Sequence, residues 1–241
     1  MNFTYKSFIE LINLLKVMNY QFTNYKEYKK VNKPVIFRHD IDNSLEKALE
    51  IARIEHDNKI KSTYFVLLST DFYNIFSKKS NAILREIINL GHEIGLHFDE
   101  KRYEINSSSD LEHYIKYEQD ILQRALNIKI NCVSMHRPSK WILDNNIEFD
   151  NIINSYSKTF LKEFKYLSDS RMYWREDVIN IIKSNKYDKL HILTHPFWYE
   201  EYEDDIKGRV GAFIRNANKE RYFYMKENIR NIEEIISEGE L

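Results

Sequence analysis

Two aspartates that follow an apolar run could act together on one reaction. Asp40 and Asp42 stand after residues 34–37, which have the pattern of a buried strand. Because side chains at i and i+2 of an extended chain point the same way, both carboxylates would face one side of the strand end. Like charges this close need a cation, a shared proton or a base. One arrangement uses both carboxylates: one binds a metal that activates water, and the other accepts a proton. The alternative is a strand-end turn, with Asn43 and Glu46 as a helix-capping pair.

Similar side chains follow four other predicted strands. In a parallel (β/α) barrel, functional side chains gather at the C-terminal ends of the strands. Core packing alone does not explain Asp, His or Arg at five strand ends. The four further positions are His97 with Asp99, His136 with Arg137, Asp169, and His195.

Alternating strand and helix patterns predict the scaffold that positions these residues. This βα repetition predicts an α/β fold with parallel strands, here a deformed TIM-type (β/α) barrel. An N-terminal helix over 4–18 is expected to act as a lid or plug. A helical pattern over 206–237 is expected to seal the barrel side, with a homo-oligomer contact or a membrane-surface helix as alternatives. The chain is predicted to form one domain, 1–241. The strands are predicted at 34–39, 62–67, 92–97, 130–135, 147–153, 164–168 and 189–194, and the intervening helices at 44–58, 80–90, 109–126 and 175–185.

Composition excludes several partner classes. The 241 residues carry 36 Lys and Arg against 37 Asp and Glu, a net charge of −1, so no overall field favours nucleic acid or an anionic membrane. The single cysteine, Cys132, cannot form an internal disulfide and is expected to be a buried strand residue. We find no apolar run long enough to span a membrane and no signal-peptide pattern, so we expect a cytoplasmic protein.

Six short motifs, taken in order, resemble one known family. The sequence is similar to the polysaccharide deacetylases of carbohydrate esterase family 4, also called NodB-like, over about residues 34–198. The Gly-His-Glu-Ile-Gly-x-His motif after a Thr-Tyr-Phe strand is the most specific part. The motifs are Arg38 to Asp42, Thr63 to Phe65, Gly91 to His97, Ser134 to Pro138, Asp169 with Trp174-Arg175, and Leu193 to Pro196.

This resemblance implies a metal-dependent acetyl hydrolase with Zn, Co or Ni held by an Asp-His-His set. Asp40 corresponds to the catalytic base and Asp42 to a metal ligand, with the exchanged assignment as the alternative. His97 matches the first metal histidine. The second would stand four residues later, where this chain has Lys101. His136 or Asp99 could replace it; we favour Asp42, His97 and His136, a mixed N/O set that suits a divalent transition metal, with zinc as the expected ion.

The resemblance also assigns roles around the metal. His195 corresponds to the acid that protonates the leaving group, which suits a histidine near neutral pH. Arg137 is expected to steady the base, and Asp169 or Arg175 to orient charged groups. Trp141 and Trp198 are expected to form walls for a sugar ring. The other histidines are read as structural, namely His39, His56, His92, His113 and His191.

The leading hypothesis is therefore a metal-dependent hydrolase that removes an acyl group from an amino sugar or glycan precursor. One alternative is a hydrolase of a non-sugar C–N amide bond on the same barrel. Another is a metal-free descendant that binds a glycan or a protein partner, which Lys101 in place of a metal histidine motivates.

Overall fold

A computed structural model describes residues 1–240 of the chain. These residues fall into two compact units, Met1–Glu201 and a second unit that begins at Tyr202. Every strand belongs to the first unit, while the second contains the long helix α7 (Ile206–Asn228). Among the described residues, none of the helices combines the length and apolar character needed to cross a bilayer.

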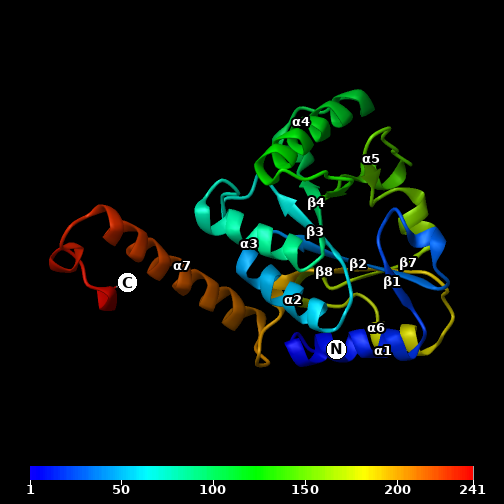
Figure 1. The fold of residues 1–241 in the computed structure, drawn as a ribbon, viewed down its shortest axis with the longest axis horizontal. Coiled ribbons are helices and arrows are strands. Elements are labelled where there is room, and N and C mark those ends of the chain that lie inside the picture. Colours follow the sequence, from blue (N-terminus) through cyan, green and yellow to red (C-terminus); the bar gives the residue numbers. More distant parts are fainter. Residues whose placement is uncertain (241) are drawn as a thin grey trace. The chain divides into compact units, whose positions relative to one another are not determined.

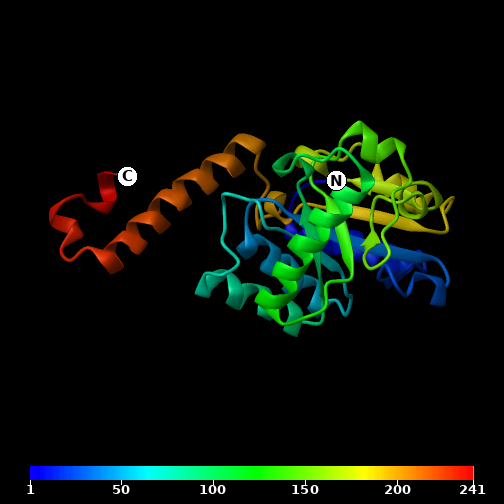
Figure 2. The ribbon, with the colours of Figure 1, turned by 90° about the horizontal axis from the view of Figure 1, so that it is seen from above.

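The first unit is built on a parallel sheet. Its eight strands run in the order β6-β5-β4-β3-β2-β8-β7, with β1 paired beside β2, and every pairing is parallel. Figure 1 and Figure 2 show the strands with the helices around them. The predicted α/β fold is confirmed, as a curled, open form of the barrel. The strands are β1 (Gln21–Thr23), β2 (Pro34–Ile41), β3 (Thr63–Leu67), β4 (Glu93–Phe98), β5 (Cys132–Met135), β6 (Ile153–Asn154), β7 (Lys165–Ser168) and β8 (Leu190–Thr194).

Helices cover the sheet in a belt. They contact one another in the order α6, α1, α2, α3, α4, so α1 is part of this belt and not the lid or plug that we expected. Phe8 of α1 contacts the rings of Phe37 and Tyr199. The helices of this unit are α1 (Tyr5–Val17), α2 (Leu45–Asp57), α3 (Lys78–Asn89), α4 (Ser108–Leu126), α5 (Lys140–Asp144) and α6 (Val178–Lys183).

Side-chain caps fix where these helices begin. The Ser44 hydroxyl accepts a hydrogen bond from the backbone N–H of Lys47, which makes Ser44 the N-cap of α2. The sequence analysis gave this role to Asn43, one residue earlier. Strand β2 ends at Ile41, and α2 begins directly after its cap, Ser44. Asp42 therefore lies in the short connection between the two elements.

The two faces of the sheet pack against two different clusters of buried side chains. Alternate β2 residues such as Phe37 join the large core beneath the helices, whereas Ile36 joins Phe65 and Cys132 in a smaller cluster. Cys132 is buried and free, as predicted. Arg38 and Asp40 share the strand face of Ile36, so the same alternation carries charge onto the inner side of the sheet.

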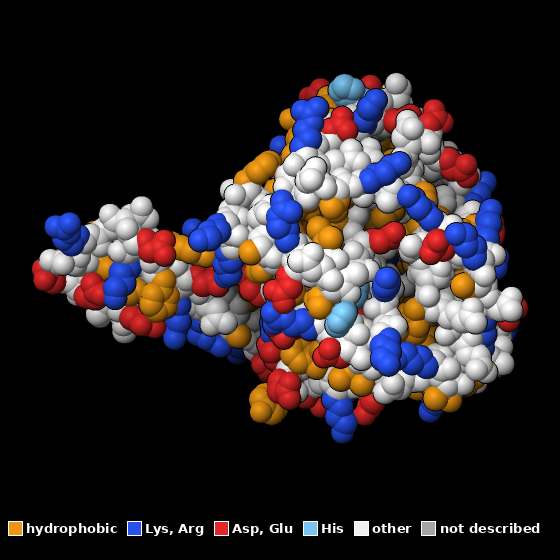
Figure 3. Space-filling view, in the orientation of Figure 1, with side chains coloured by type: hydrophobic (Ala, Val, Ile, Leu, Met, Phe, Trp, Pro, Cys, Tyr) orange, Lys and Arg blue, Asp and Glu red, His pale blue; other side chains and the backbone are white. Residues whose placement is uncertain are grey.

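Charged side chains of both signs are scattered over the face seen in Figure 3. Figure 3 shows Lys and Arg side chains mixed with Asp and Glu side chains over the visible face. This distribution agrees with the net charge of −1.

Candidate active site

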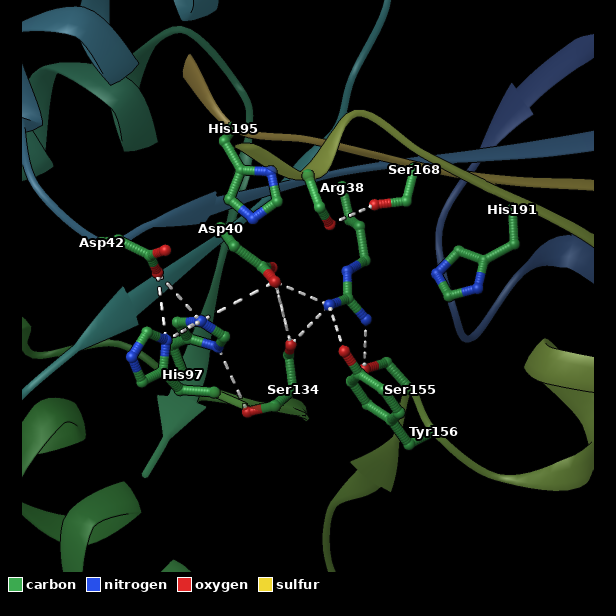
Figure 4. Close-up of polar contacts among 12 residues, drawn as sticks. Arg38, Asp40, Asp42, His97, Ser134, Ser155, Tyr156, Ser168, His191 and His195 are labelled. Atoms are coloured by element: carbon green, nitrogen blue, oxygen red, sulfur yellow. Dashed lines mark hydrogen bonds and ion pairs between the residues drawn. The ribbon is translucent and has the colours of Figure 1, made fainter. Parts of the chain in front are cut away.

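Three side chains from the ends of β2, β4 and β5 converge at one point, with β3 lying between β2 and β4 in the sheet. Asp42 follows β2, His97 is the penultimate residue of β4, and His136 follows β5. The Oδ1 atom of Asp42 lies 3.2 Å from His97 Nε2 and 3.3 Å from His136 Nδ1, and the two nitrogens are 3.2 Å apart. Figure 4 shows Asp42 and His97 with their polar atoms facing each other. The structure thus brings together the three residues that the sequence analysis selected as ligands.

The donor chemistry and spacing of this triad fit a metal ion. Tetrahedral zinc with bonds of about 2.0–2.2 Å to N and O places neighbouring ligand atoms about 3.3–3.6 Å apart, close to the observed separations. Asp42 Oδ1 is buried and has no hydrogen-bond partner among the described residues. His97 Nδ1 lies 3.4 Å from the carbonyl oxygen of Ser134, the contact that leaves Nε2 free to ligate. A cation at the centre would satisfy all three atoms.

Of the two predicted replacements for the missing histidine, Asp99 lies outside the triad and His136 lies within it. Asp99 caps a short helical turn by accepting a hydrogen bond from the backbone N–H of Lys101, at 3.1 Å. Lys101 itself is exposed. His136 therefore occupies the third place, reached from the end of the next strand.

Asp40 lies beside the triad and is held by a buried arginine. Its Oδ2 accepts a hydrogen bond of 2.7 Å from Arg38 Nη2 and lies 3.7 Å from His97 Nε2. Burial raises the pKa of Asp40, but the charge of Arg38, followed by those of His97 and His195, lowers it by more, so the pKa lies below its ordinary value. Asp40 is therefore an ionised carboxylate next to the candidate metal position.

Arg38 is fully buried and is itself held from several directions. It donates through Nη2 to Ser134 Oγ at 2.7 Å and through Nη1 to Ser155 Oγ at 2.9 Å. The ring of Tyr156 lies 5.0 Å from the guanidinium carbon, a cation–π contact. Figure 4 shows the guanidinium between the Asp40 carboxylate and the hydroxyls of Ser155 and Tyr156.

This contact corrects the role predicted for Arg137. Arg137 is exposed, with a left-handed backbone (φ 53°), and Arg38 makes the ion pair with Asp40 instead. The sequence signal was available, because Arg38 is two residues before Asp40 and so shares its strand face.

Asp42 is also held in its charged form. Burial raises its pKa, but the contacts with His136 and His97 outweigh that effect, and the pKa lies well below its ordinary value. The Asp42 side chain is 27% exposed, whereas its Oδ1 atom, which faces the two histidines, is buried.

A second pair of side chains, Asp169 and His195, lies near Asp40 and Asp42. His195 Nδ1 lies 2.7 Å from Asp169 Oδ1, and the fully buried Asp169 also accepts hydrogen bonds from the His195 backbone N–H and from the Tyr199 hydroxyl. Burial lowers the pKa of His195, but the hydrogen bond with Asp169 and the charges of Asp169, Asp42 and Asp40 raise it to about 9. His195 is thus held as a cation near neutral pH. In Figure 4, His195 and His97 lie on either side of the aspartates.

The residues predicted to contact substrate are spread along the same edge of the sheet. Trp141, on α5, is 39% exposed. Trp198 is the last residue of the short helical turn Pro196–Trp198 and is half-buried, with an indole N–H that has no hydrogen-bond partner among the described residues. Arg175 is exposed beyond β7. Among the described residues, no hydrogen bond or ion pair joins Trp141, Trp198 or Arg175 to the triad.

Buried histidines outside the site have structural partners. His39 bridges Thr194 Oγ1, at 2.6 Å, and Glu55 Oε1, at 2.8 Å. His92 contacts the Ala52 carbonyl, and His191 lies 2.8 Å from the Tyr25 hydroxyl. These contacts fit the structural roles predicted for the three histidines.

Comparisons with known proteins give structural matches only. No family model and no curated protein matches the sequence. Solved structures that match it include carbohydrate esterase family 4 proteins. The family 4 pseudoenzyme BA3943 of Bacillus anthracis is 14% identical over 78% of this chain and 61% of its own, with a TM-score of 0.44.

Two deacetylases are among the other matches. Deacetylase PplD of Streptococcus pyogenes, solved with acetate, is 15% identical over 80% of this chain and 83% of its own, with a TM-score of 0.45. Peptidoglycan deacetylase PdaC of Bacillus subtilis is 12% identical over 80% of this chain and 96% of its own, with a TM-score of 0.45. The chain spans less than two thirds of the BA3943 chains, 61% of the wild type and 63% of a mutant with restored activity.

Proposed function

We propose that this chain is a metal-dependent hydrolase that removes an acyl group from the nitrogen of an amino sugar or glycan precursor. The observation that carries the proposal is the convergence of Asp42, His97 and His136 within 3.2–3.3 Å of one another, beside an ionised Asp40. The carbohydrate part of the proposal comes from the resemblance to carbohydrate esterase family 4. A hydrolase of a non-sugar amide on the same residues is the second candidate.

The triad is the proposed metal-binding set. A divalent metal, zinc being the expected ion, would polarise the acyl carbonyl and increase the acidity of a water molecule. The protein supplies two imidazole nitrogens and one carboxylate oxygen, a common ligand set for zinc.

Asp40 is proposed as the general base. It takes a proton from the attacking water as the water oxygen bonds to the acyl carbon. Arg38 acts as a positioning residue, because its hydrogen bond fixes the Asp40 carboxylate and its charge keeps that carboxylate ionised. Without Arg38, a buried carboxylate at this position would favour the protonated form, which cannot act as a base.

His195 is proposed as the general acid. Its Nδ1 is engaged by Asp169, which leaves Nε2 to give a proton to the leaving nitrogen as the C–N bond breaks. The products are a free amine and a carboxylate. Trp141, Trp198 and Arg175 are proposed to contact the sugar, because all three follow strand ends at the edge where the triad lies.

Metal analysis tests the proposal. Protein purified without chelator should contain about one transition-metal ion per chain by mass spectrometry, and His97→Ala and His136→Ala should lose it. His113→Ala, which removes an exposed histidine from α4, is the matched control and should keep the metal.

Activity completes the test. The metal-loaded wild type should release acetate from N-acetylated amino sugars, whereas Asp40→Asn should keep the metal and lose the activity by about 10²–10⁴-fold. Absence of metal after reconstitution with Zn, Co and Ni would overturn the proposal and favour a metal-free binding protein. Release of acetate from simple amides but not from sugars would favour the second candidate.

A further inference from the structure

The second compact unit contains a long helix that buries few of its own side chains. Helix α7 runs unbroken over 23 residues (Figure 1), and Arg209 and Tyr222 are its buried residues. Helices in water gain most of their stability from packing one face against a partner, because the first turn is costly to form. The exposed length of α7 is therefore a candidate contact surface.

One line of side chains along α7 has the spacing of a coiled coil. Six positions are separated alternately by four and by three residues, which is the pattern of the a and d positions in a heptad. All but one of the six are apolar or aromatic, the exception being Glu220. These six residues, named here the a/d stripe, are Ile206, Val210, Phe213, Ala217, Glu220 and Tyr224.

The a/d stripe is accessible along its length. Ile206 is 48% exposed, Val210 is 37% exposed and Tyr224 is 50% exposed, while Phe213 and Ala217 are half-buried. Scattered apolar side chains on a surface need no explanation, but a continuous exposed line of them marks an interaction site. The heptad spacing specifies another helix as the partner.

An antiparallel pair of α7 helices matches large side chains with small ones. With a two-fold axis beside position 215, residues equally far from that position face each other, and each a position meets a d position. Phe213 then faces Ala217 of the partner subunit, and Ile206 faces Tyr224 of the partner subunit. Because the axis repeats every contact, both central layers place a ring against a methyl group, the alternation that close packing favours.

Charge favours the antiparallel direction. Glu220 faces Val210 of the partner subunit in this arrangement. The e positions that flank the same layer are Arg221 and Lys207 of the partner subunit, so the carboxylate lies between two cations. In a parallel pair, Glu220 would face its own copy across the seam, and such a juxtaposition of like charges costs several kcal/mol.

The same glutamate argues against a membrane surface as the occupant. A helix that lies on a membrane buries a broad apolar face and keeps its charges on the opposite face. The a/d stripe is a narrow seam, and Glu220 interrupts it between Ala217 and Tyr224. A second helix with cations beside that position suits the seam better than lipid does.

We propose that α7 pairs with α7 of a second copy of this chain in an antiparallel coiled coil. Phe213 and Ala217 form the central layers, and the two copies make a two-fold symmetric dimer. The inference is independent of the proposed function, because no residue of the candidate active site belongs to α7.

A charge placed at position 210 tests both the contact and its direction. Val210→Glu puts a carboxylate opposite Glu220 of the partner subunit, so the Kd of the dimer should rise at least about tenfold. Val210→Lys puts an ammonium group opposite the same carboxylate and should dimerise at least about tenfold more tightly than Val210→Glu. Sedimentation equilibrium of the full-length proteins over a concentration series measures each Kd. Glu and Lys both favour helices, so circular dichroism should show the same helix content in both variants.

A rescue and a matched control complete the design. The double variant Val210→Glu with Glu220→Lys places opposite charges in both symmetric layers and should recover part of the dimer that Val210→Glu loses. Met225→Glu and Met225→Lys are the controls, because Met225 is 47% exposed on α7 but lies outside the a/d stripe. Each should have the wild-type Kd.

A wild-type chain that stays monomeric over the whole concentration series would overturn the proposal, as would equal Kd values for Val210→Glu and Met225→Glu. A dimer that Val210→Lys weakens as much as Val210→Glu does would overturn the antiparallel direction. The metal content of Val210→Glu should equal that of the wild type, so loss of the dimer and loss of the metal site are separate results.

Discussion

Among the charged neighbours of Asp40, Arg38 lowers the pKa of its carboxyl the most. Replacement by Gln removes the charge that offsets burial, so the pKa of Asp40 should rise and the acidic limb of the pH–rate profile should move to higher pH. The lower activity should coincide with a loss of stability of about 3–5 kcal/mol, because a buried ion pair loses one partner.

Arg38→Lys provides the comparison, since it keeps the charge but not the fork that reaches Ser134 and Ser155 together. The shift of the acidic limb should be smaller in Arg38→Lys than in Arg38→Gln. Coincident pH–rate profiles for wild type and Arg38→Gln would refute the positioning role. Steady-state kinetics over pH 4–8 measures this difference.

His195 links the site to the pH dependence of folding. Its pKa is raised to about 9 in the folded chain, above about 6.5 in the unfolded chain. The stabilisation is therefore fully present below pH 6.5 and is lost as the pH rises through 9, with a magnitude of about 3–4 kcal/mol. Urea unfolding of the metal-free protein measures this difference. The free energy of unfolding of the wild type should exceed that of His195→Gln by this amount at pH 6 and by much less at pH 10.

His113→Gln serves as the control for loss of a histidine elsewhere, on the exposed face of α4. A stability difference between wild type and His195→Gln that stays constant from pH 6 to pH 10 would show that the pair with Asp169 does not shift the pKa of His195.

At the residue scale, the sequence predicted which side chains lie together at the site better than it predicted the hydrogen-bond partners that hold them. Strand-end positions could identify a group of candidate residues that includes Asp42, His97 and His136, and the resemblance to carbohydrate esterase family 4 singled out these three as ligands. Ser155 and Tyr156 could not be chosen, because they lie beyond a two-residue strand, β6, in a region without clear periodicity. A hydroxyl on a loop has no sequence signal until an arginine is known to point at it.

At the scale of elements, Gly95 shows how closely β3 and β4 pack. A Cβ atom at this position would lie 2.5 Å from two ring carbons of Phe65 and 3.1 Å from Cys132 Sγ. Gly95→Ala should therefore lower the free energy of unfolding by about 1–3 kcal/mol through overpacking. The ring of Phe65 also lies 5.3 Å from the Arg38 guanidinium carbon, so its displacement should reduce activity as well.

Gly211→Ala is the matched control, because a Cβ there meets only the flexible end of the Arg215 side chain, at 3.0 Å, and alanine favours a helix interior. Chemical unfolding compares the two variants. Equal stability of Gly95→Ala and wild type would mean that the strands can separate to accept a methyl group.

Elements with strong periodicity were predicted almost to the residue. The helix predicted over 109–126 is α4 (Ser108–Leu126), and the strand predicted over 34–39 is β2, which continues to Ile41. The predicted strand over 147–153 shrinks to Ile153–Asn154, and β1 was not predicted. Both are short strands at the margins of the pattern, where two or three residues cannot establish an alternation of period two.

At the scale of the whole molecule, removal of the residues from Tyr202 onward tests how the chain divides. The sequence predicts one domain, whereas every strand, the triad, Asp40 and the Asp169–His195 pair lie within Met1–Glu201. We expect a chain of residues 1–201 to fold cooperatively and to bind the same amount of metal as the full chain. Thermal unfolding and metal analysis of both proteins measure this.

Aggregation of the shortened chain, or loss of its metal, would instead support the single domain. Destabilisation without metal loss would indicate that α7 contributes to folding but not to the site.

The strand order has a consequence for how the site forms during synthesis. The central strand β2 is made early, but β8, one of the three strands that pair with it, is the last of the described strands, and Arg38 is 117 residues from Ser155. At about 5–20 residues per second, a ribosome needs roughly 6–23 s to make those 117 residues. During that interval an apolar strand with a charged end has no finished sheet around it. The candidate site therefore becomes complete only after His195 has been synthesised, although the strand that carries Asp40 is made more than a hundred residues earlier.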